Sequence, residues 1–329
     1  MVGQDERHVP VLLQDAIQYL NVQPGGTYVD ATLGMAGHSS AIARLLGKSG
    51  KLIAFDRDPE AMAIAKANLA RLAEELGAEM PTLELIDEEF STAGEKLEAA
   101  SVDGILADFG ISSMQLSEAH RGFSFQADGP LDMRMNPRIG VTAAQVVNRS
   151  DEKDLANLIY EFGEERRSRR IARAIVRARP ITTTAELARV VAGCAPTMKS
   201  ERHYIHPATR TFQALRIYVN GELDEITALL EQAPRLLKPG GRLVVISFHS
   251  LEDRIAKDSL REGAKQGIYE ILTRKPQTAS EEETDRNPRS RSAKMRAAIR
   301  IEQQPKSTMQ QKSWQESGPG SSHRGTRRK

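Results

Sequence analysis

The sequence predicts an α/β fold in which an open, mostly parallel sheet is interrupted by a helical insertion. Two buried-strand segments, residues 27–30 and 51–55, each run into a carboxylate, and a small-residue loop and a helix separate them. Three further strand segments are expected at 82–86, 102–107 and 242–248. No strand pattern is visible between about residues 116 and 210. Strands that alternate with helices favour a parallel sheet, and a helix-only stretch within that alternation indicates an insertion rather than a second tandem domain.

The first part of the chain supplies the alternation of strands and helices. Apolar residues at helical spacing predict a leading helix, and an alanine-rich segment with leucines at the same spacing predicts a longer one. The expected elements are a helix over 9–20, a turn at 24–26, strand 27–30, a helix from about residue 38, strand 51–55, a helix over 60–76, and strands 82–86 and 102–107. Asp30, Asp56 and Asp108 stand at the ends of three of these strands.

The helical stretch and the return of the sheet define the expected domains. Helices are expected over 141–148, 153–161, 165–178 and 184–193, then a helix over 212–237 broken near Pro234, and strand 242–248. We therefore expect a sheet domain in two parts, 1–118 and 212–302, with a helical, substrate-recognising insertion at 119–211. Residues 303–329 are polar and basic, which is typical of a disordered tail.

Composition excludes several classes of protein. The chain has 329 residues, of which 40% are hydrophobic and 27% charged, as in an ordinary globular protein. Its single cysteine, Cys194, cannot form an internal disulfide, and no cysteine cluster is available for zinc. No signal peptide and no run of about 20 apolar residues is visible. We therefore expect a cytoplasmic protein without a membrane partner; the oligomeric state is not predicted.

Basic residues are clustered although the net charge is only +2. Arginines crowd residues 164–179 and 286–300, and the segment 324–329 is also basic. Such blocks favour surfaces that meet phosphate. The alternative is a set of helix surfaces whose arginines pair with neighbouring glutamates.

The loop after the first strand predicts a ligand at the edge of the sheet. A dinucleotide site requires Gly-x-Gly-x-x-Gly directly after the strand, whereas here the strand ends at Asp30 and the glycines are Gly34 and Gly37. A carboxylate at that place would repel a pyrophosphate and would suit a ligand with a cationic end, such as S-adenosylmethionine. Asp56 lies roughly 20 residues beyond the first glycine, where an acid commonly binds ribose hydroxyls. The alternative for these aspartates is turn formation and helix capping.

Longer motifs narrow the choice of ligand. They are HVPVLL at 8–13, DFGISSMQL at 108–116, RGFSF at 121–125, DGPLDMRM at 128–135, HPATRTFQALRI at 206–217, SFHSLEDR at 247–254 and NPRSRS at 287–292. Over about residues 8–300 the chain resembles the ribosomal small-subunit RNA methyltransferase H family, also called MraW. The resemblance implies a Rossmann-like class I methyltransferase sheet with a helical insertion domain. It also implies S-adenosyl-L-methionine as cofactor, and N4-methylation of a specific cytidine in the decoding region of 16S ribosomal RNA, within the small ribosomal subunit.

The same resemblance implies which residues contact the cofactor. They are Ala36, Gly37, His38, Asp56, Phe90, Asp108 and Gln115. In one respect the chain departs from the family, which usually has two glycines before the histidine where this chain has Ala36 and Gly37. An alanine adds only a methyl group, so we expect cofactor binding to survive. The close approach of the backbone to the ligand at residue 36 is the feature that this departure affects.

The group that would activate the acceptor nitrogen is left open by the sequence. The exocyclic nitrogen of cytosine is a poor nucleophile because its lone pair is delocalised, and a hydrogen-bond acceptor on the amino group would localise that pair. Asp108 and the backbone carbonyls of residues 109–112 are the candidates, unless Asp108 is engaged with the cofactor. No metal is expected, because His206 and His249 do not stand in an acid–histidine pattern.

Candidate RNA contacts come from the insertion and its junctions. Phe123, Phe125 and His249 are candidates to stack on an unstacked base, with core packing as the alternative for the phenylalanines. Arg134, Arg210 and Arg216 are candidates to contact phosphates. The competing functions are a methyltransferase of the same fold that acts on another nucleic acid, a dehydrogenase, and a non-catalytic RNA-binding module. Asp30 argues against the dehydrogenase, and a binding module has no use for a ribose-binding acid.

Overall fold

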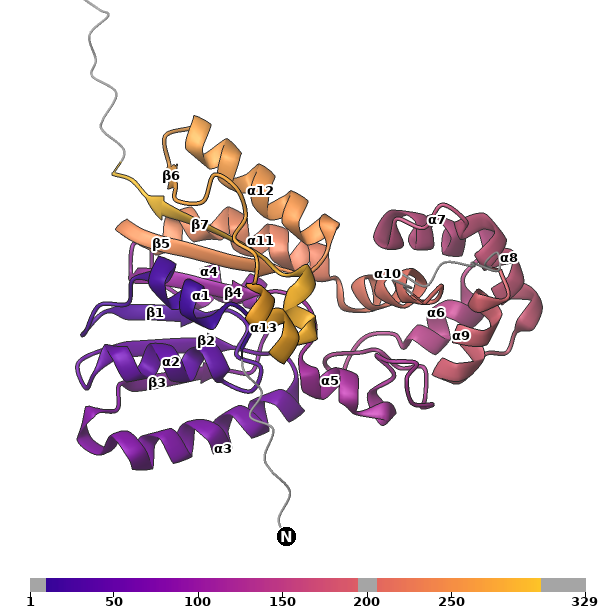
Figure 1. Cartoon of the computed structure of the whole chain (residues 1–329), viewed down its shortest axis with the longest axis horizontal. Coiled ribbons are helices and arrows are strands. Elements are labelled where there is room, and N and C mark those ends of the chain that lie inside the picture. Colours follow the sequence, from indigo (N-terminus) through magenta and orange to yellow (C-terminus); the bar gives the residue numbers. More distant parts are fainter. Residues whose placement is uncertain (1–9, 195–205, 303–329) are drawn as a thin grey trace, which may run out of the picture.

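The computed structural model describes residues 10–194 and 206–302 (Figure 1). Its centre is a seven-stranded sheet with the strand order β3-β2-β1-β4-β5-β7-β6. The strands are β1 (Thr27–Asp30), β2 (Lys51–Phe55), β3 (Thr82–Ile86), β4 (Val102–Asp108), β5 (Leu237–Ser247), β6 (Tyr269–Ile271) and β7 (Lys294–Arg300). Strands β1 to β5 are parallel to their neighbours in that group, whereas β7 pairs antiparallel with β5 and β6. The predicted α/β class with a mostly parallel sheet is confirmed.

Helices cover both faces of this sheet because its central strands are apolar on both sides. Tyr28 and Leu52 pack on one face with α1 (Leu13–Leu20), α2 (Gly37–Leu46) and α3 (Pro59–Leu76). Val29 and Ile53, the next residues along the same strands, pack on the other face. That face is covered by α4 (Ala93–Lys96), α11 (Glu222–Leu236) and α12 (Ser250–Lys265).

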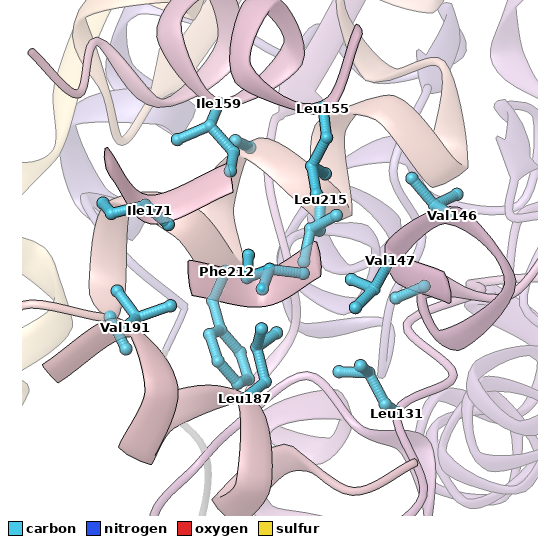
Figure 2. Close-up of a cluster of buried hydrophobic side chains, with 14 of the residues drawn as sticks. Leu131, Val146, Val147, Leu155, Ile159, Ile171, Leu187, Val191, Phe212 and Leu215 are labelled. Atoms are coloured by element: carbon cyan, nitrogen blue, oxygen red, sulfur yellow. The ribbon is translucent and has the colours of Figure 1, made fainter. Parts of the chain in front are cut away.

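A separate group of helices extends from the carboxyl edge of the sheet (Figure 1). It comprises α6 (Ala143–Arg149), α7 (Glu152–Gly163), α8 (Ser168–Ala178), α9 (Thr184–Ala192) and α10 (Thr209–Asn220). These helices share their own hydrophobic cluster. Figure 2 shows Phe212 and Leu215 of α10 pointing into it, among side chains such as Leu155 and Leu187. Because α10 belongs to this cluster, we propose that the insertion extends past the predicted boundary at 211 to Asn220.

Two further short helices lie near the junction of the two parts. Helix α5 (Ser113–Ser117) follows β4, and α13 (Glu281–Arg286) precedes β7. The 3-10 turn that follows α13 contacts α5, because Arg289 donates a hydrogen bond to Ser113 Oγ. The predicted tail, 303–329, lies outside the described residues.

Three predicted boundaries are wrong. The first helix begins at Leu13 rather than residue 9, because Leu12 has a left-handed backbone with φ 53°. The predicted helix over 212–237 is two helices that break at Gly221, with φ 59°, and Pro234 is accommodated in the last turn of α11. The last predicted strand starts earlier, at Leu237, and ends at Ser247.

Strands β6 and β7 were not predicted, and β7 corrects our interpretation of the basic block 286–300. Met295, Ala297 and Ala298 of this strand are fully buried. Arg296 is also buried and donates a hydrogen bond to Asp253 Oδ1 over 2.7 Å. Much of the block is therefore a strand inside the sheet rather than a surface that could meet phosphate.

The strand order predicts where on the sheet a ligand would bind. β1 lies between β2 and β4, so the sheet is built outward in both directions from the β1–β4 pair. In open α/β sheets, ligands bind outside the carboxyl ends of the strands at this reversal of order. Asp30 ends β1, Asp108 ends β4, and Asp56 follows β2, so all three acids stand at this edge.

Candidate active site

A cavity of about 880 Å³ opens at the carboxyl edge of the sheet. Its wall is formed by both parts of the molecule. The loops after the strands contribute Thr32, Gly34, Asp56, Phe90, Asp108 and Phe109. The insertion and its junctions contribute Phe123, Phe125, Phe212, Gln213 and Arg216. A ligand bound along the sheet edge and a second one entering from the insertion would therefore meet in one space.

Asp56 is positioned by two backbone amides. The Gly34 N–H donates to its Oδ2 over 2.8 Å, and the Asp58 N–H donates to its Oδ1 over 2.8 Å. Gly34 has φ 52°, a conformation that favours glycine, and the turn that it makes aims its N–H at the carboxylate. Burial raises the pKa of Asp56 to about 7, although these two hydrogen bonds act in the opposite direction. The oxygens keep further lone pairs for hydroxyl donors from a ligand in the cavity.

The electrostatic environment of Asp108 favours a cationic partner. Its Oδ1 is buried and has no hydrogen-bond partner among the described residues. Its Oδ2 lies 3.7 Å from His38 Nδ1. Burial raises the pKa of Asp108 well above its usual range, and the negative charges of Asp30 and Glu252 raise it further. A cationic ligand group beside Oδ1 would satisfy this atom and relieve the electrostatic cost, so the site fits the positively charged end of S-adenosylmethionine.

Asp30 does not have the role that we gave it. Its side chain is 1% exposed and does not contribute to the wall of the cavity as formed by the described residues. Its Oδ2 accepts a hydrogen bond from Ser39 Oγ over 2.7 Å, and its Oδ1 accepts one from the Thr32 N–H over 3.1 Å. Asp30 thus ties the loop to the start of α2, and it acts on the ligand site only through its charge near Asp108.

The segment 36–38 lies beside the cavity rather than on its wall. Ala36 is fully buried and has φ 66°, so an alanine occupies a left-handed position where a glycine would be unstrained. A Cβ on Gly37 would lie 2.3 Å from Pro10 Cγ, which explains the glycine by close packing. His38 is buried, and its Nε2 lies 3.1 Å from the Val11 carbonyl oxygen. Their contact with a cofactor stays a prediction.

A buried ion pair that the sequence analysis missed joins the two parts of the molecule. Arg121 Nη2 donates to Asp58 Oδ2 over 2.8 Å, and the two side chains are 4% and 0% exposed. Gln115 Nε2 donates to the same oxygen over 2.7 Å, while Gln115 Oε1 accepts from the Ser112 N–H. Arg121 also donates to the carbonyl oxygens of Arg134 and Met135. The only local signal was the Asp58-Pro59 pair that caps α3.

Aromatic side chains line two regions of the cavity. The rings of Phe90 and Phe109 have centroids 6.2 Å apart, and both residues line the same cavity as Asp56 and Asp108. In the insertion, Phe125 contacts Phe212 edge to face, with centroids 4.9 Å apart. Phe123 is 5% exposed, and the Arg121 guanidinium lies 5.7 Å from the centre of its ring. Phe123 and Phe125 thus pack within the structure and also border the cavity, and their stacking on a base stays a prediction.

A group of largely buried charges reaches the wall of the cavity through Arg216 and Glu222. Arg216 makes a two-pronged contact with Glu222, 2.8 Å for each pair of atoms, and lies 3.9 Å from Glu252. His249 Nδ1 accepts from the Glu252 N–H at the start of α12, and its Nε2 lies 3.1 Å from Glu252 Oε1. Glu222, His249 and Glu252 present ligand atoms within 4.8 Å of one another, as a metal site would. The Arg216 guanidinium already supplies the positive charge there, so we assign no metal to this group.

Comparison with known proteins decides the family. A sequence profile of the MraW methylase family matches residues 5–301. The chain belongs to the MraW methylase family. It is 76% identical over 293 residues to a ribosomal RNA small subunit methyltransferase H from Acidobacterium capsulatum, which covers 89% of this chain and 98% of the relative. A protein of the same name from Koribacter versatilis is 60% identical over 293 residues, or 89% of this chain and 94% of the relative.

The solved structures include a putative rRNA-methylase from Clostridium thermocellum, with a TM-score of 0.45 and 12% identity over 90% of this chain and 99% of that one. Family membership and the observed sheet confirm the expected Rossmann-like class I methyltransferase fold. This member of the MraW methylase family is accordingly an enzyme that transfers a methyl group. Within the described residues, no helix is both long and apolar enough to cross a membrane.

The candidate phosphate contacts of this MraW methylase differ in availability. Arg134 donates to both carboxylate oxygens of Asp132 over 2.8 Å, and Arg216 is held in the same way by Glu222. A phosphate would have to displace these carboxylates, which disfavours Arg134 and Arg216 as RNA contacts. Arg210 is exposed and, within the described residues, donates to the Glu164 carbonyl oxygen, and its charge also acts on the Glu164 carboxylate. His249 and Arg134 do not lie on the wall of the cavity formed by the described residues.

The block 164–179 presents several exposed arginines of the insertion. Arg166, Arg170 and Arg177 are exposed on and beside α8, and no ion pair of theirs occurs within the described part of the chain. Arg173 does pair with a glutamate, Glu152, over 3.5 Å. Arg169 donates to Asn157, and Arg179 donates to the carbonyl oxygens of Val147 and Ser150. Local contacts therefore account for part of this block, and the contact of its exposed arginines with phosphate stays a prediction.

Proposed function

We propose that this MraW methylase uses S-adenosyl-L-methionine to methylate N4 of a specific cytidine in the decoding region of 16S ribosomal RNA. The observation that carries the cofactor is the pair of carboxylates on one cavity wall, Asp56 beside Gly34 and Asp108 with its unpartnered Oδ1. The substrate class is supported by relatives named ribosomal RNA small subunit methyltransferase H. The choice of N4 and of the decoding region rests on the family motifs.

In this proposal the cofactor lies along the carboxyl edge of β2, β1 and β4. Asp56 accepts hydrogen bonds from the ribose hydroxyls, and Phe90 and Phe109 border the adenine. Asp108 faces the cationic end, where its unpartnered Oδ1 is available. Gln115 contributes to the wall but has both ends of its amide engaged by Ser112 and Asp58, so we assign it a supporting role.

The protein's main contribution to the reaction is positioning. The bound cofactor supplies an electrophilic methyl group, and the acceptor nitrogen must approach it in line. Holding two reactants in that geometry can lower a barrier by about 7–11 kcal/mol. The loop after β4, with Gly110 at φ 99°, contributes residues 109–112 to the wall of the cavity, where the cytosine amino group would arrive. With Asp108 engaged by the cofactor, these carbonyls of residues 109–112 are the better candidates to accept from the amino group.

The RNA would approach over the insertion. A base must leave its stack to reach the cavity, and the aromatic residues Phe123 and Phe125 border the route. The exposed arginines of α8 and Arg210 would neutralise phosphates on either side of that nucleotide. We propose 16S ribosomal RNA within the small ribosomal subunit as the partner and the cytoplasm as the location of the enzyme.

The test is a methylation assay with defined substrates. The purified protein is incubated with isotopically labelled S-adenosylmethionine and either naked 16S RNA or isolated small subunits, and nucleosides are then identified by mass spectrometry. Labelled N4-methylcytidine at one site is the expected product. RNA binding without transfer would favour the non-catalytic module. Label on a different nucleic acid or on another atom of the base would refute the assigned substrate.

A further inference from the structure

The NPRSRS segment places an arginine in the cavity that the proposed function has not used. Arg289 belongs to the short 3-10 turn Pro288–Ser292 and contributes to the cavity wall. Its Nη1 donates to Ser113 Oγ, and its Nη2 lies 3.5 Å from the Ser112 carbonyl oxygen. These serines follow β4 directly, in the loop where we expect the acceptor base. A residue far along the chain is therefore brought against the reaction site.

Arg289 differs electrostatically from the two other arginines of the cavity wall, Arg57 and Arg216. Arg216 is bound by Glu222, and the charge of Arg57 acts on the neighbouring carboxylates Asp56 and Glu225. In contrast, no carboxylate oxygen within the described residues lies within 4.0 Å of the Arg289 guanidinium. Burial lowers the pKa of Arg289, with no acidic neighbour to offset the effect.

A half-buried cation without a counter-charge is costly, and the cost disappears when an anion binds beside it. A guanidinium carries five N–H donors in a planar fork that matches phosphate and carboxylate oxygens. Two of the five are directed at the serines. The remaining donors are available to a ligand, because Arg289 stands on the wall of the cavity.

We propose that Arg289 is the anion-binding residue of the cavity and that it positions an anionic oxygen of the bound reactants. This inference rests on the proposed function, which supplies two such oxygens: a phosphate of the RNA nucleotide that enters the cavity, and the carboxylate of the cofactor's methionine. In either case Arg289 fixes one reactant against the loop after β4. The rival explanation is that Arg289 only braces α5 through Ser113.

Three variants separate these explanations. Arg289→Gln removes the charge, whereas Ser113→Ala removes the brace and leaves the charge. Arg44→Gln is the matched control for loss of one positive charge, because Arg44 lies on α2 and pairs with Glu75 away from the cavity. Thermal unfolding and circular dichroism establish that each variant is folded before any affinity is compared.

The measurements are dissociation constants for S-adenosylmethionine, for 5′-methylthioadenosine, which lacks the amino-acid part, and for an RNA fragment that contains the target cytidine. If Arg289 binds phosphate, Arg289→Gln weakens RNA binding at least tenfold and reduces the slope of log K against log salt by about 1, with unchanged cofactor affinity. If it binds the carboxylate, S-adenosylmethionine binding falls at least tenfold and 5′-methylthioadenosine binding does not change.

The proposal is overturned if Arg289→Gln is folded and all three affinities stay within twofold of the unaltered protein. It is also overturned if Ser113→Ala reproduces the whole loss, since the brace would then explain it. Methylation by the unaltered protein is recorded in parallel. Failure of that reaction would refute the proposed function, whereas the binding measurements would still report on Arg289.

Discussion

Replacement of Asp56 by asparagine should separate ribose recognition from folding. The substituted side chain would have nearly the same shape, but its NH₂ group would face a backbone N–H, either that of Gly34 or that of Asp58, each now 2.8 Å from a carboxylate oxygen. It would also lose the charge that receives the ribose hydroxyls. A hydrogen bond to a charged group contributes about 1.5–3 kcal/mol. Loss of two such bonds, partly replaced by one neutral bond, should weaken cofactor binding by about 3 kcal/mol, or roughly 100-fold in Kd.

Isothermal titration of S-adenosylmethionine at pH 8 measures this effect, and thermal unfolding checks that Asp56→Asn is folded. The unaltered protein should also show a pH dependence, because the pKa of Asp56 is raised to about 7 by burial. The carboxylate accepts from both hydroxyls and predominates above that pKa, whereas the protonated form predominates below it. Affinity should therefore fall about tenfold from pH 8 to pH 6. The ribose assignment is refuted if Asp56→Asn binds within threefold of the unaltered protein, or if it retains the same pH dependence.

Three further perturbations test other parts of the structure. Arg121→Ala leaves the Asp58 carboxylate buried without its cation, so the free energy of unfolding measured in urea should fall by about 3–5 kcal/mol. A loss below about 1 kcal/mol would contradict the inference that this pair holds the insertion against the sheet. The double change Arg170→Gln and Arg177→Gln should lower RNA affinity and reduce the salt slope by about 2, without any effect on cofactor titration; equal loss of both affinities would point to misfolding. Ala36→Gly relieves left-handed backbone strain of about 1–2 kcal/mol. It also removes a buried methyl group and raises the entropy of the unfolded chain, and these two losses of stability have a similar total size. The free energy of unfolding should therefore change by less than about 1 kcal/mol, and cofactor affinity by less than threefold. A tenfold change in that affinity would show that the Ala36 methyl group does contact the ligand.

The sheet was largely predictable because its central strands are short apolar runs bounded by turns. Strands β1, β2 and β3 begin and end where the pattern indicates. Strand β7 was hidden because Lys294, Arg296 and Arg300 alternate with apolar residues and gave the segment the appearance of a basic surface. Its positive charges are accommodated by partners that only the fold brings near, such as Asp253 for Arg296. A pattern of basic residues alone does not distinguish an exposed basic surface from a strand whose basic side chains pair with carboxylates.

The site was predicted in part for the same reason. Asp56 and Asp108 were recognisable because they follow buried strands, and strand ends of a parallel sheet meet at one edge. Asp30 also ends a buried strand, yet its carboxylate oxygens accept hydrogen bonds from Ser39 and Thr32. No pattern in the sequence shows which way the side chain at the end of a strand turns. The pairing of Asp58 with Arg121, across 63 residues, likewise depends on how the insertion docks on the sheet.

The arginines of the insertion fall into two groups, those that pair with buried carboxylates and those that do not. Arg121 and Arg216 are buried with their own carboxylates, so they hold the insertion against the sheet and set the shape of the cavity. Arg166, Arg170 and Arg177 have no such partners in the described part of the chain and face outward. A polyanion can therefore bind the outer arginines without competing for the inner ones. Because the inner pairs would stay intact, the proposed function would allow RNA to be attracted electrostatically toward the cavity while Asp56 and Asp108 keep their positions.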